Sequence, residues 1–307
     1  MPTGFISHSD CLKHEMGNYH PECPERLTAI EDQLLLSRIN DFLIKLTPPL
    51  ATEENLNLVH SKEHIEFVKS IRPSAGYAEI DGDTLMNPHS WNAALRAAGA
   101  GILAVDAIMN KELVNAFCSV RPPGHHAEPN KAMGFCFFNN LAIAAKYAVS
   151  KYAIQRVAII DFDVHHGNGT EHAFMQDERF LMCSFFQHPL FPYSGTNNTA
   201  KNMLNTPVPA FTNGQTIRQL VEEHWLPRLN EFKPEFIFIS AGFDAHREDE
   251  LGQMGLIESD YAWLTQQIVA IAKQYAQGRI VSCLEGGYNL SALSRSVVAH
   301  IKELAEI

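Results

Sequence analysis

The sequence is poor in cysteine, and its cysteines lack the spacing of a structural site. There are six in 307 residues, they are scattered, and no two form a Cys-x-x-Cys pair. This excludes a disulfide frame and a cysteine-based zinc site. Cys118, Cys183 and Cys283 lie inside apolar runs typical of strands, so we expect reduced, mostly buried thiols.

Charge is sparse and has the wrong sign for nucleic acid. Charged residues make up 19% of the chain, the formal net charge is −11, and no block of like charges reaches five residues. Phosphate binding needs a basic stripe, so we expect no nucleic-acid partner. An acidic surface is compatible with a cationic substrate but is also an ordinary solubility feature, and we favour the second interpretation.

Long hydrophobic runs are missing as well. The longest weakly polar stretch, 97–109, contains Asp106 and is shorter than the roughly 20 apolar residues of a membrane span. Residues 1–8 have neither the basic start nor the apolar core of a signal peptide. We therefore expect a cytoplasmic protein with no membrane partner, and the sequence favours no particular oligomeric state.

No linker, repeat or low-complexity segment divides the chain, so we predict one domain over residues 1–307. Short apolar runs alternate with helical patterns, which is typical of a mainly parallel α/β sheet buried on both faces. The predicted strands are 115–120, 156–160, 180–186, 236–240 and 279–284. The predicted helices begin after Pro24 and Ser61 and cover about 90–103, 140–152, 217–229 and 261–275.

A polar cluster follows each predicted strand. The clusters are Arg-Pro-Pro-Gly-His-His from 121, Asp-Phe-Asp-Val-His-His-Gly-Asn-Gly from 161, Gln-His-Pro-Leu-Phe-Pro from 187, Ala-Gly-Phe-Asp-Ala-His from 241 and Glu-Gly-Gly-Tyr from 285. The carboxyl ends of parallel strands form the edge at which α/β sheets bind ligands. The sequence therefore predicts an active site at this edge.

Asp163 and His165 form a candidate metal site. Residues i and i+2 at the end of a strand point the same way, so these side chains can converge. A carboxylate and an imidazole are zinc ligands, and a catalytic zinc takes three protein ligands and leaves one position open. Asp244, after another predicted strand, could be the third. Asp-x-His alone could instead cap a helix or bind water, but the second aspartate and the nearby histidine pair favour a metal.

The histidine pair and one tyrosine could carry the proton chemistry. His125 and His126 follow a rigid Pro-Pro-Gly turn, and an imidazole can move a proton between water and a leaving amine. Asp161 and Asn168 are candidates to orient the second ring nitrogen. Tyr288 follows two glycines, and its hydroxyl can donate to an oxyanion. Each motif alone also fits an ordinary loop; beside Asp-x-His, the catalytic interpretation is favoured.

Together these segments resemble the zinc-dependent histone deacetylase family, in a class II-like form. That family includes acetylpolyamine amidohydrolases and acetoin utilization proteins. The resemblance rests on 121–127 (RPPGHHA), 134–139 (GFCFFN), 161–170 (DFDVHHGNGT), 242–245 (GFDA) and 285–288 (EGGY), with 20–27 similar to the family's N-terminal motif. It covers nearly the whole chain in the family's order. It implies the arginase/deacetylase fold, a mainly parallel sheet with helices on both faces, and hydrolysis of acetyl-amine amides.

The resemblance also implies roles for the matching residues. His126 would be the general base and acid, His125 its electrostatic partner paired to Asp161, and Tyr288 the group that polarises the amide carbonyl. One catalytic Zn²⁺ would be held by Asp163, His165 and Asp244. A structural K⁺ beside it would be held, with main-chain carbonyls, by Asp161, Asp163, His165 and Ser184. The walls of a narrow acyl-lysine tunnel would be Gly134, Phe135 and Phe191.

Three further positions refine the expected substrate and activity. Asp83 could contact the substrate backbone at the tunnel rim, although a solvated turn is an alternative. Asn168 stands where nuclear class I enzymes have aspartate, and Tyr288 is present where weakly active class IIa members have histidine, so we expect a competent enzyme. Some polyamine deacetylases have a glutamate gatekeeper where this chain has Leu251. This disfavours a polyamine, although the acidic segment 248–250 could serve in its place.

The main expectation is a zinc-dependent amidohydrolase that removes acetyl or another short acyl group from acyl-lysine in a protein or peptide. An acetylpolyamine amidohydrolase would share every catalytic residue and is the alternative. A ureohydrolase of the arginase fold would need a two-manganese site with bridging aspartates, which the sequence does not show after Asp163. An inactive acyl-lysine-binding module is disfavoured by the intact histidine pair and tyrosine.

Overall fold

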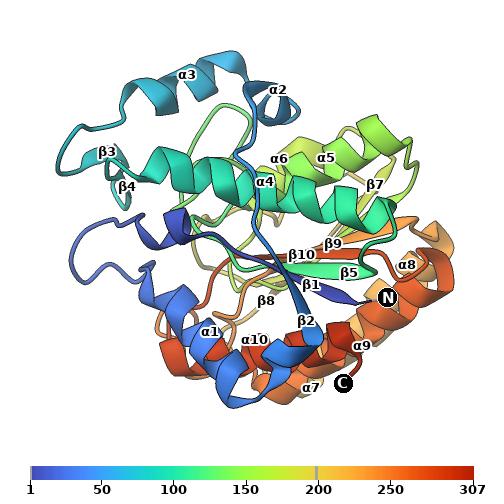
Figure 1. Cartoon of the computed structure of the whole chain (residues 1–307). Coiled ribbons are helices and arrows are strands. Elements are labelled where there is room, and N and C mark those ends of the chain that lie inside the picture. Colours follow the sequence, from blue (N-terminus) through green and yellow to red (C-terminus); the bar gives the residue numbers. More distant parts are fainter. Residues whose placement is uncertain (1, 198–199) are drawn as a thin grey trace.

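The centre of the protein is one eight-stranded sheet in the order β2-β1-β5-β10-β9-β6-β7-β8. The computed structural model describes residues 2–197 and 200–307 (Figure 1). All neighbouring strands of this sheet are parallel, which confirms the predicted fold class. The strands are β1 (Thr3–Ile6), β2 (Leu43–Leu46), β5 (Asn115–Cys118), β6 (Val157–Asp161), β7 (Phe180–Gln187), β8 (Met203–Val208), β9 (Phe236–Ala241) and β10 (Ile280–Leu284).

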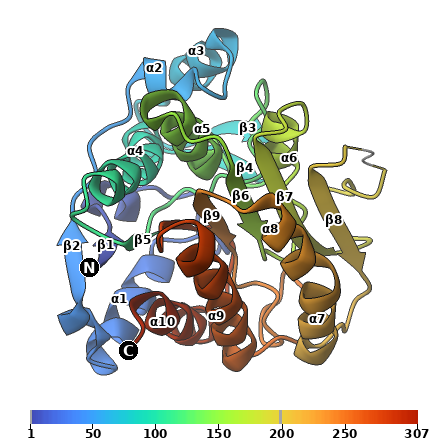
Figure 2. The same ribbon diagram turned by 90° about the vertical axis from the view of Figure 1, so that its right-hand side faces the viewer.

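Helices cover both faces of the sheet. Figures 1 and 2 show α4 and α5 over one face and α1, α9 and α10 over the other. The α-helices are α1 (Glu25–Leu36), α2 (Glu53–Leu56), α3 (Lys62–Ser70), α4 (Ser90–Met109), α5 (Asn140–Tyr152), α6 (Asn168–Phe174), α7 (Gly214–Leu220), α8 (Leu226–Phe232), α9 (Glu258–Tyr275) and α10 (Leu290–Ala305). Shorter elements are the helical turns η1 (Ser9–Leu12), η2 (Ile39–Phe42) and η3 (Val221–Trp225) and the hairpin of β3 (Ala78–Asp81) and β4 (Thr84–Met86).

Burial explains which strands could be predicted. β5, β6, β7, β9 and β10 are buried at every residue, and each matches a predicted apolar run. The edge strands β2 and β8 are partly exposed, and β1 has only Phe5 and Ile6 as large apolar residues, so none of these three gave a long apolar run. Helix α10 is also not among the predicted elements, although Leu293, Val297, Ile301 and Leu304 recur on one buried face.

Local chemistry sets the helix boundaries. Ser61 caps α3 by accepting the His64 N–H, which agrees with the predicted helix start after Ser61, and Asn139 and Asn289 cap α5 and α10 in the same way. The predicted helix 217–229 is divided into α7, the π-helical turn η3 and α8. Pro227 lacks the N–H that would continue an α-helical ladder, which accounts for the irregular turn before it.

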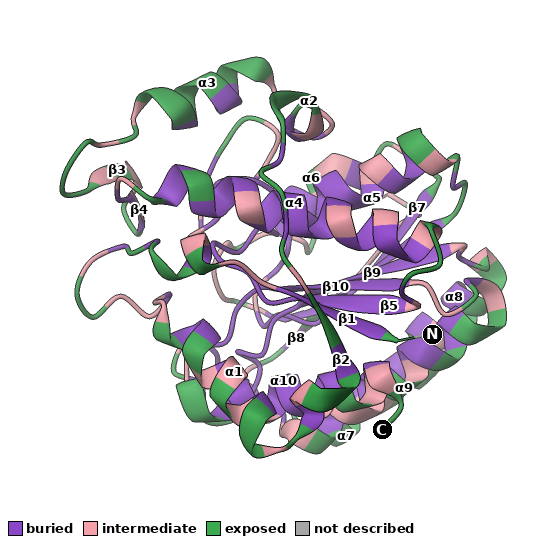
Figure 3. Cartoon of the chain, viewed as in Figure 1, coloured by how far each residue is buried: buried purple, intermediate pink, exposed green. Residues whose placement is uncertain are grey.

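Helix α4 is apolar and mostly buried against the sheet and α5. Within the described residues it is the one helix that is long and apolar enough to cross a membrane by composition. However, 72% of its apolar window is buried inside the protein, and Figure 3 shows most of the helix in the buried colour. It is therefore a core helix, packed against α5.

The sheet order places the predicted polar clusters together. β5, β10, β9, β6 and β7 are consecutive neighbours, and each predicted cluster follows one of them. Because these strands are parallel, their carboxyl ends form a single edge. The fold therefore gathers five loops, distant in sequence, at one place.

Candidate active site

Two aspartates and a histidine converge at this edge. The donor atoms of Asp163, His165 and Asp244 all lie within 4.8 Å of one another. His165 Nδ1 is 3.0 Å from Asp163 Oδ1 and 3.2 Å from Asp244 Oδ2. Both carboxylates are completely buried. Asp244 reaches the others because it follows β9, which pairs with β6.

The convergence has a different cause from the predicted one. β6 ends at Asp161, so Asp163 and His165 lie in the loop beyond the strand. Side chains shape that loop by accepting its own N–H groups. The Asp163 N–H donates to Asp161 Oδ1 at 3.1 Å, and the His165 N–H donates to Asp163 Oδ1 at 2.9 Å. The residues meet, but the strand-alternation argument for their meeting is wrong.

The cluster fits a divalent cation. Two carboxylates and an imidazole nitrogen form a zinc-type donor set. Apart from its ion-pair contact with His165 Nδ1, Asp244 Oδ2 is buried without a hydrogen bond among the described residues, an arrangement that a bound cation would relieve. Burial raises the pKa of Asp244 to about 7, and the charge of Asp163 adds to the rise. Burial lowers the pKa of His165, but the two carboxylates outweigh it and raise this pKa to about 10.

A glycine allows the loop after β10 to approach the carboxylates. The Gly286 N–H donates to Asp163 Oδ2 at 2.9 Å. A Cβ at Gly286 would lie 1.9 Å from Asp244 Oδ2 and 2.7 Å from Asp163 Oδ2. Any side chain would therefore fill the space between the two carboxylates, so the position requires glycine.

His125 belongs to a buried ion pair beneath this cluster. Its Nδ1 lies 3.1 Å from Asp161 Oδ2, and its Nε2 lies 3.7 Å from Asp163 Oδ2. Burial lowers the pKa of His125, but the surrounding carboxylates, chiefly Asp163 and Asp161, raise it to about 10. His125 is therefore a cation at neutral pH, placed against Asp161 as the family resemblance implies.

His126 is held in a different state by a different partner. Its Nδ1 lies 2.8 Å from Asn168 Oδ1, and the Asn168 amide is oriented by donating to Glu128 Oε1 at 2.8 Å. This orientation makes Nδ1 the protonated nitrogen and leaves Nε2 with a lone pair. Burial, aided by the charges of His125 and His165, holds the pKa of His126 well below its usual value. A neutral ring with a free lone pair can accept a proton.

Glu285 fixes the turn that carries the histidine pair. This buried carboxylate accepts the Gly124 N–H at 2.6 Å and the His125 N–H at 3.0 Å, and Ser240 Oγ donates to it at 3.2 Å. Burial raises the pKa of Glu285 to about 7. The turn after β5 is thus attached to the ends of β9 and β10.

A cavity of about 240 Å³ opens over the cluster. All five residues predicted to bind substrate line it, together with His126, His165 and Tyr288. The lining residues are Asp83, His126, Gly134, Phe135, His165, Leu190, Phe191, Leu251 and Tyr288. Burial raises the pKa of the Tyr288 phenol well above its usual value, so its hydroxyl stays protonated and can donate. The cavity is apolar along its walls and polar at its floor.

One wall of the cavity depends on left-handed backbone. Gly134 and Phe135 have φ values of 56° and 68°. A Cβ at Gly134 would lie 2.6 Å from the His126 ring and 3.0 Å from the Phe191 ring. The Phe135 N–H donates to Thr84 Oγ1 at 3.0 Å, which offsets the unusual conformation.

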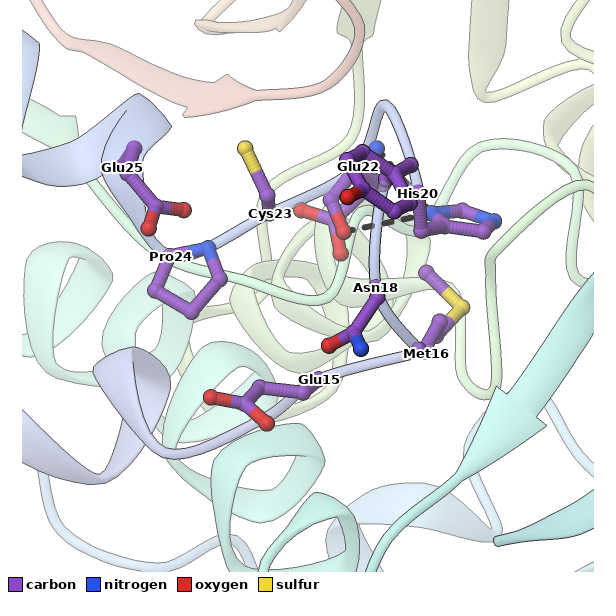
Figure 4. A pocket seen from close by; sticks show the side chains of 10 residues that line it. Glu15, Met16, Asn18, His20, Glu22, Cys23, Pro24 and Glu25 are labelled. Carbon is purple, nitrogen blue, oxygen red and sulfur yellow. Dashed lines mark hydrogen bonds between the residues drawn. The ribbon is translucent and has the colours of Figure 1, made fainter.

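The N-terminal motif supports this wall from outside. His20 packs edge-on against Phe135, with ring centroids 4.7 Å apart, and its Nε2 lies 3.1 Å from the Asp83 carbonyl oxygen. His20 also lines a separate hollow of about 430 Å³ formed by residues 15–20 and 22–25. Figure 4 shows that the side chains around this hollow come from the loop before α1 and from Glu25 at the start of that helix. His20 thus connects that loop to the mouth of the cavity.

The predicted potassium ligands are also close together. Asp161 and Ser184 are register partners on β6 and β7. Ser184 Oγ is buried and lacks a hydrogen-bond partner within residues 2–197 and 200–307. These residues fit a monovalent cation, and the potassium site stays a prediction.

The three acids of the segment 248–250 have different environments. Glu248 pairs with Arg295 at 3.0 Å, and Asp249 turns inward to accept backbone N–H groups. Glu250 lines a side hollow of about 370 Å³ next to the cavity, with Leu251 and Tyr288. Of these three acids, Glu250 is the one that faces this hollow.

Several residues around the site have a task that the sequence did not assign. Glu22 and Arg26 lie within the N-terminal motif, Glu285 within EGGY and Leu190 within the cluster from 187, so the motifs marked these positions without giving their function. Glu128 lies in no motif, and Asp249 was considered only within the acidic segment 248–250. Their partners are far away in sequence, as for Asp249 and Tyr288, and only the fold brings them together.

Comparison with known proteins points to one family. The family model described as histone deacetylase domain matches residues 20–304. A probable deacetylase of Archaeoglobus fulgidus is 39% identical over 298 residues, covering 94% of this chain and 82% of its own length. A histone deacetylase-like amidohydrolase of Pseudomonas aeruginosa is 34% identical, with 99% of this chain and 86% of its own covered. The crystal structure of the HDA15 HD domain superposes with a TM-score of 0.93 at 33% identity, covering 99% of this chain and 90% of that one.

Proposed function

Because this chain belongs to the histone deacetylase family of deacetylases and amidohydrolases, we propose that it is a zinc-dependent acyl-lysine deacetylase. It hydrolyses the amide between the lysine side-chain amine of a protein or peptide and an acetyl or another short acyl group, and releases the corresponding carboxylate, which is acetate for an acetyl group. The observation that carries the proposal is the buried Asp163, His165 and Asp244 cluster. It lies at the floor of an apolar cavity that His126 and Tyr288 also line.

Each step uses a group whose protonation state suits it. Zinc held by Asp163, His165 and Asp244 would polarise the amide carbonyl and lower the pKa of an attacking water. His126 Nε2 accepts the proton of that water, because Asn168 keeps the proton of the neutral ring on Nδ1. The protonated Tyr288 hydroxyl donates to the oxyanion of the tetrahedral intermediate. His126 then returns the proton to the leaving amine, while the cationic His125 stabilises the negative charge of the site.

The cavity suits the stem of an acylated lysine. Phe135, Phe191, Leu190 and Leu251 give it apolar walls, which can cover an aliphatic chain and exclude water. Asp83 at the rim can accept an N–H from the substrate backbone. We propose K⁺ at Asp161, Asp163, His165 and Ser184 as a structural ion, supported by the unpartnered Ser184 hydroxyl. We also propose that residues 1–307 act as one catalytic domain in the cytoplasm, where the six free cysteines would stay reduced.

The proposal is tested by comparing an acetyl-lysine peptide panel with acetylputrescine and acetylspermidine, each with and without a metal chelator. Faster hydrolysis of the peptides, abolished by chelation and restored by zinc, is expected. Preference for the acetylpolyamines would overturn the lysine assignment and leave the amidohydrolase chemistry standing. Binding of the peptide with no acetate release would instead indicate an acyl-lysine-binding module.

A further inference from the structure

The strongest unassigned feature is the buried carboxylate of Asp249, which lies in the loop that follows Asp244. Its side chain is almost fully enclosed and accepts three backbone N–H groups. Oδ2 accepts from Tyr288 at 2.6 Å and from Asn289 at 3.0 Å, and Oδ1 accepts from Leu251 at 3.0 Å. One carboxylate therefore joins the backbone of two residues that line the cavity.

The peptide unit between Gly287 and Tyr288 is held from both ends. Its carbonyl oxygen accepts from Arg26 Nε at 2.6 Å, while its N–H donates to Asp249. The Arg26 guanidinium also lies 5.0 Å from the centre of the Tyr288 ring. Gly287 has a φ of 116°, a conformation with many neighbouring alternatives for glycine. A buried cation and a buried anion on one peptide unit select a single orientation from them.

We propose that Asp249 is a positioning residue for Tyr288, and that through Leu251 it ties the rim of the cavity to the tyrosine. The inference rests on the proposed role of the Tyr288 hydroxyl. A carboxylate is needed because both oxygens receive N–H donors. An asparagine has a single acceptor oxygen, so its amide group would face a buried N–H at one end. The loop or the tyrosine must then move.

A double-mutant cycle of Asp249→Asn and Tyr288→Phe tests this. Losing a donor to an oxyanion costs about 10²–10³ in rate. Asp249→Asn displaces this donor without removing it, so it should lower kcat by a factor of at least about 10 but by no more than the loss seen in Tyr288→Phe. It should also raise KM modestly through Leu251. In the Tyr288→Phe background the same substitution should change kcat less than about threefold, because the group it positions is already gone. Multiplicative losses in the double variant would overturn the inference.

A second measurement does not depend on turnover or on metal. In metal-free protein labelled with 3-fluorotyrosine, the Tyr288 fluorine resonance is identified by its loss in Tyr288→Phe. Asp249→Asn should shift and broaden this resonance by releasing the backbone at residue 288. An unchanged Tyr288 resonance would contradict the positioning role. If Asp249→Asn folds poorly, Asp249→Ser, which also lacks the second acceptor, provides the same cycle and the same spectrum.

Asp260 supplies a matched control. Asp260 is as buried as Asp249 and likewise accepts a backbone N–H, from Ile257 at 3.0 Å. It differs in lying on α9, where it pairs with Arg218. Asp260→Asn should lower thermal stability without changing kcat or the Tyr288 resonance. A wild type inactive on every acyl substrate would refute the proposed function. An active wild type impaired by Tyr288→Phe, with Asp249→Asn behaving like Asp260→Asn, would refute the inference alone.

Discussion

Replacing Asn168 by aspartate should move the acid limb of the pH–rate profile to higher pH. Asn168 Oδ1 lies 2.8 Å from His126 Nδ1, and both side chains are buried. In the native chain a neutral amide faces the ring, and burial keeps the pKa of His126 well below its usual value. A carboxylate in its place stabilises the protonated ring. The pKa of His126 rises, and the base form is lost at a higher pH as the solution is acidified.

The expected shift is about one to three pH units. Two opposite charges 4 Å apart interact by about 4 kcal/mol at an effective dielectric constant of about 20. At about 1.36 kcal/mol per pKa unit, that sets an upper value of about 3 units, in line with the usual range for paired groups. Glu128 reduces the effect, because its Oε1 now accepts from the Asn168 amide at 2.8 Å and would face the new carboxylate. One of the two acids would then hold a proton.

Glu128→Gln removes this competition, so the double variant Asn168→Asp with Glu128→Gln should show the larger shift. The assay is kcat/KM for an acetyl-lysine peptide across the pH range, with metal content measured for each variant. The rate above the new pKa should match the wild type, since His126 is neutral there in both. Asn230→Asp, on the exposed side of α8, adds the same charge away from the site and should leave the profile unchanged. An acid limb at the wild-type position in both Asn168 variants would refute His126 as the base.

Three further predictions follow from the metal cluster and the tyrosine. Asp244→Ala should abolish zinc retention, as measured by mass spectrometry of dialysed protein. A fully metallated variant would contradict the assignment of Asp244 as a zinc ligand. Tyr288→Phe should retain zinc and lose about 10²–10³ in turnover, and undiminished turnover would remove Tyr288 from the mechanism. Zinc uptake by metal-free protein at neutral pH should release protons, because the pKa of His165 is raised to about 10 and a ligating imidazole must lose its proton. Titration calorimetry in buffers of different ionisation enthalpy measures this release, and an enthalpy independent of buffer would contradict it.

The predictable part of the fold is the part that is buried on both faces. A strand such as β9, with every residue buried, is apolar at all positions but Ser240, so its position can be predicted from local composition. The edge strand β8 includes Asn205 and Thr206 and is half open to solvent, so no such requirement acts on it. The interruption at η3 has a local cause in Pro227, and the sequence contained that signal.

The candidate site was predictable to the extent that its chemistry is written in contiguous motifs. Asp163 and His165 lie two residues apart, and His125 and His126 are adjacent. Their protonation states could not be predicted in this way, because the state of each histidine depends on a partner from another loop. His125 is cationic through Asp161 and Asp163, whereas His126 is neutral with Asn168. Adjacent, identical side chains thus acquire opposite protonation states, which no local pattern could assign.

The acids that hold the loops of the site show why the other site residues could be identified only from the structure. Asp249 and Glu285 accept backbone N–H groups of other loops. Almost every residue has a backbone N–H group, so the residue types in the sequence do not identify the partners of these acids. A metal ligand differs, because its partners must come from the few residue types that bind metal, such as histidine, cysteine, aspartate and glutamate. Asp249 lies in the acidic segment 248–250, which the sequence suggested only as a substitute for a gatekeeper glutamate, and its burial distinguishes it from Glu248 and Glu250. A buried carboxylate must replace the hydrogen bonds that it loses from water. The loops at this edge supply them through their N–H groups, and the same hydrogen bonds hold the loop backbone in one conformation.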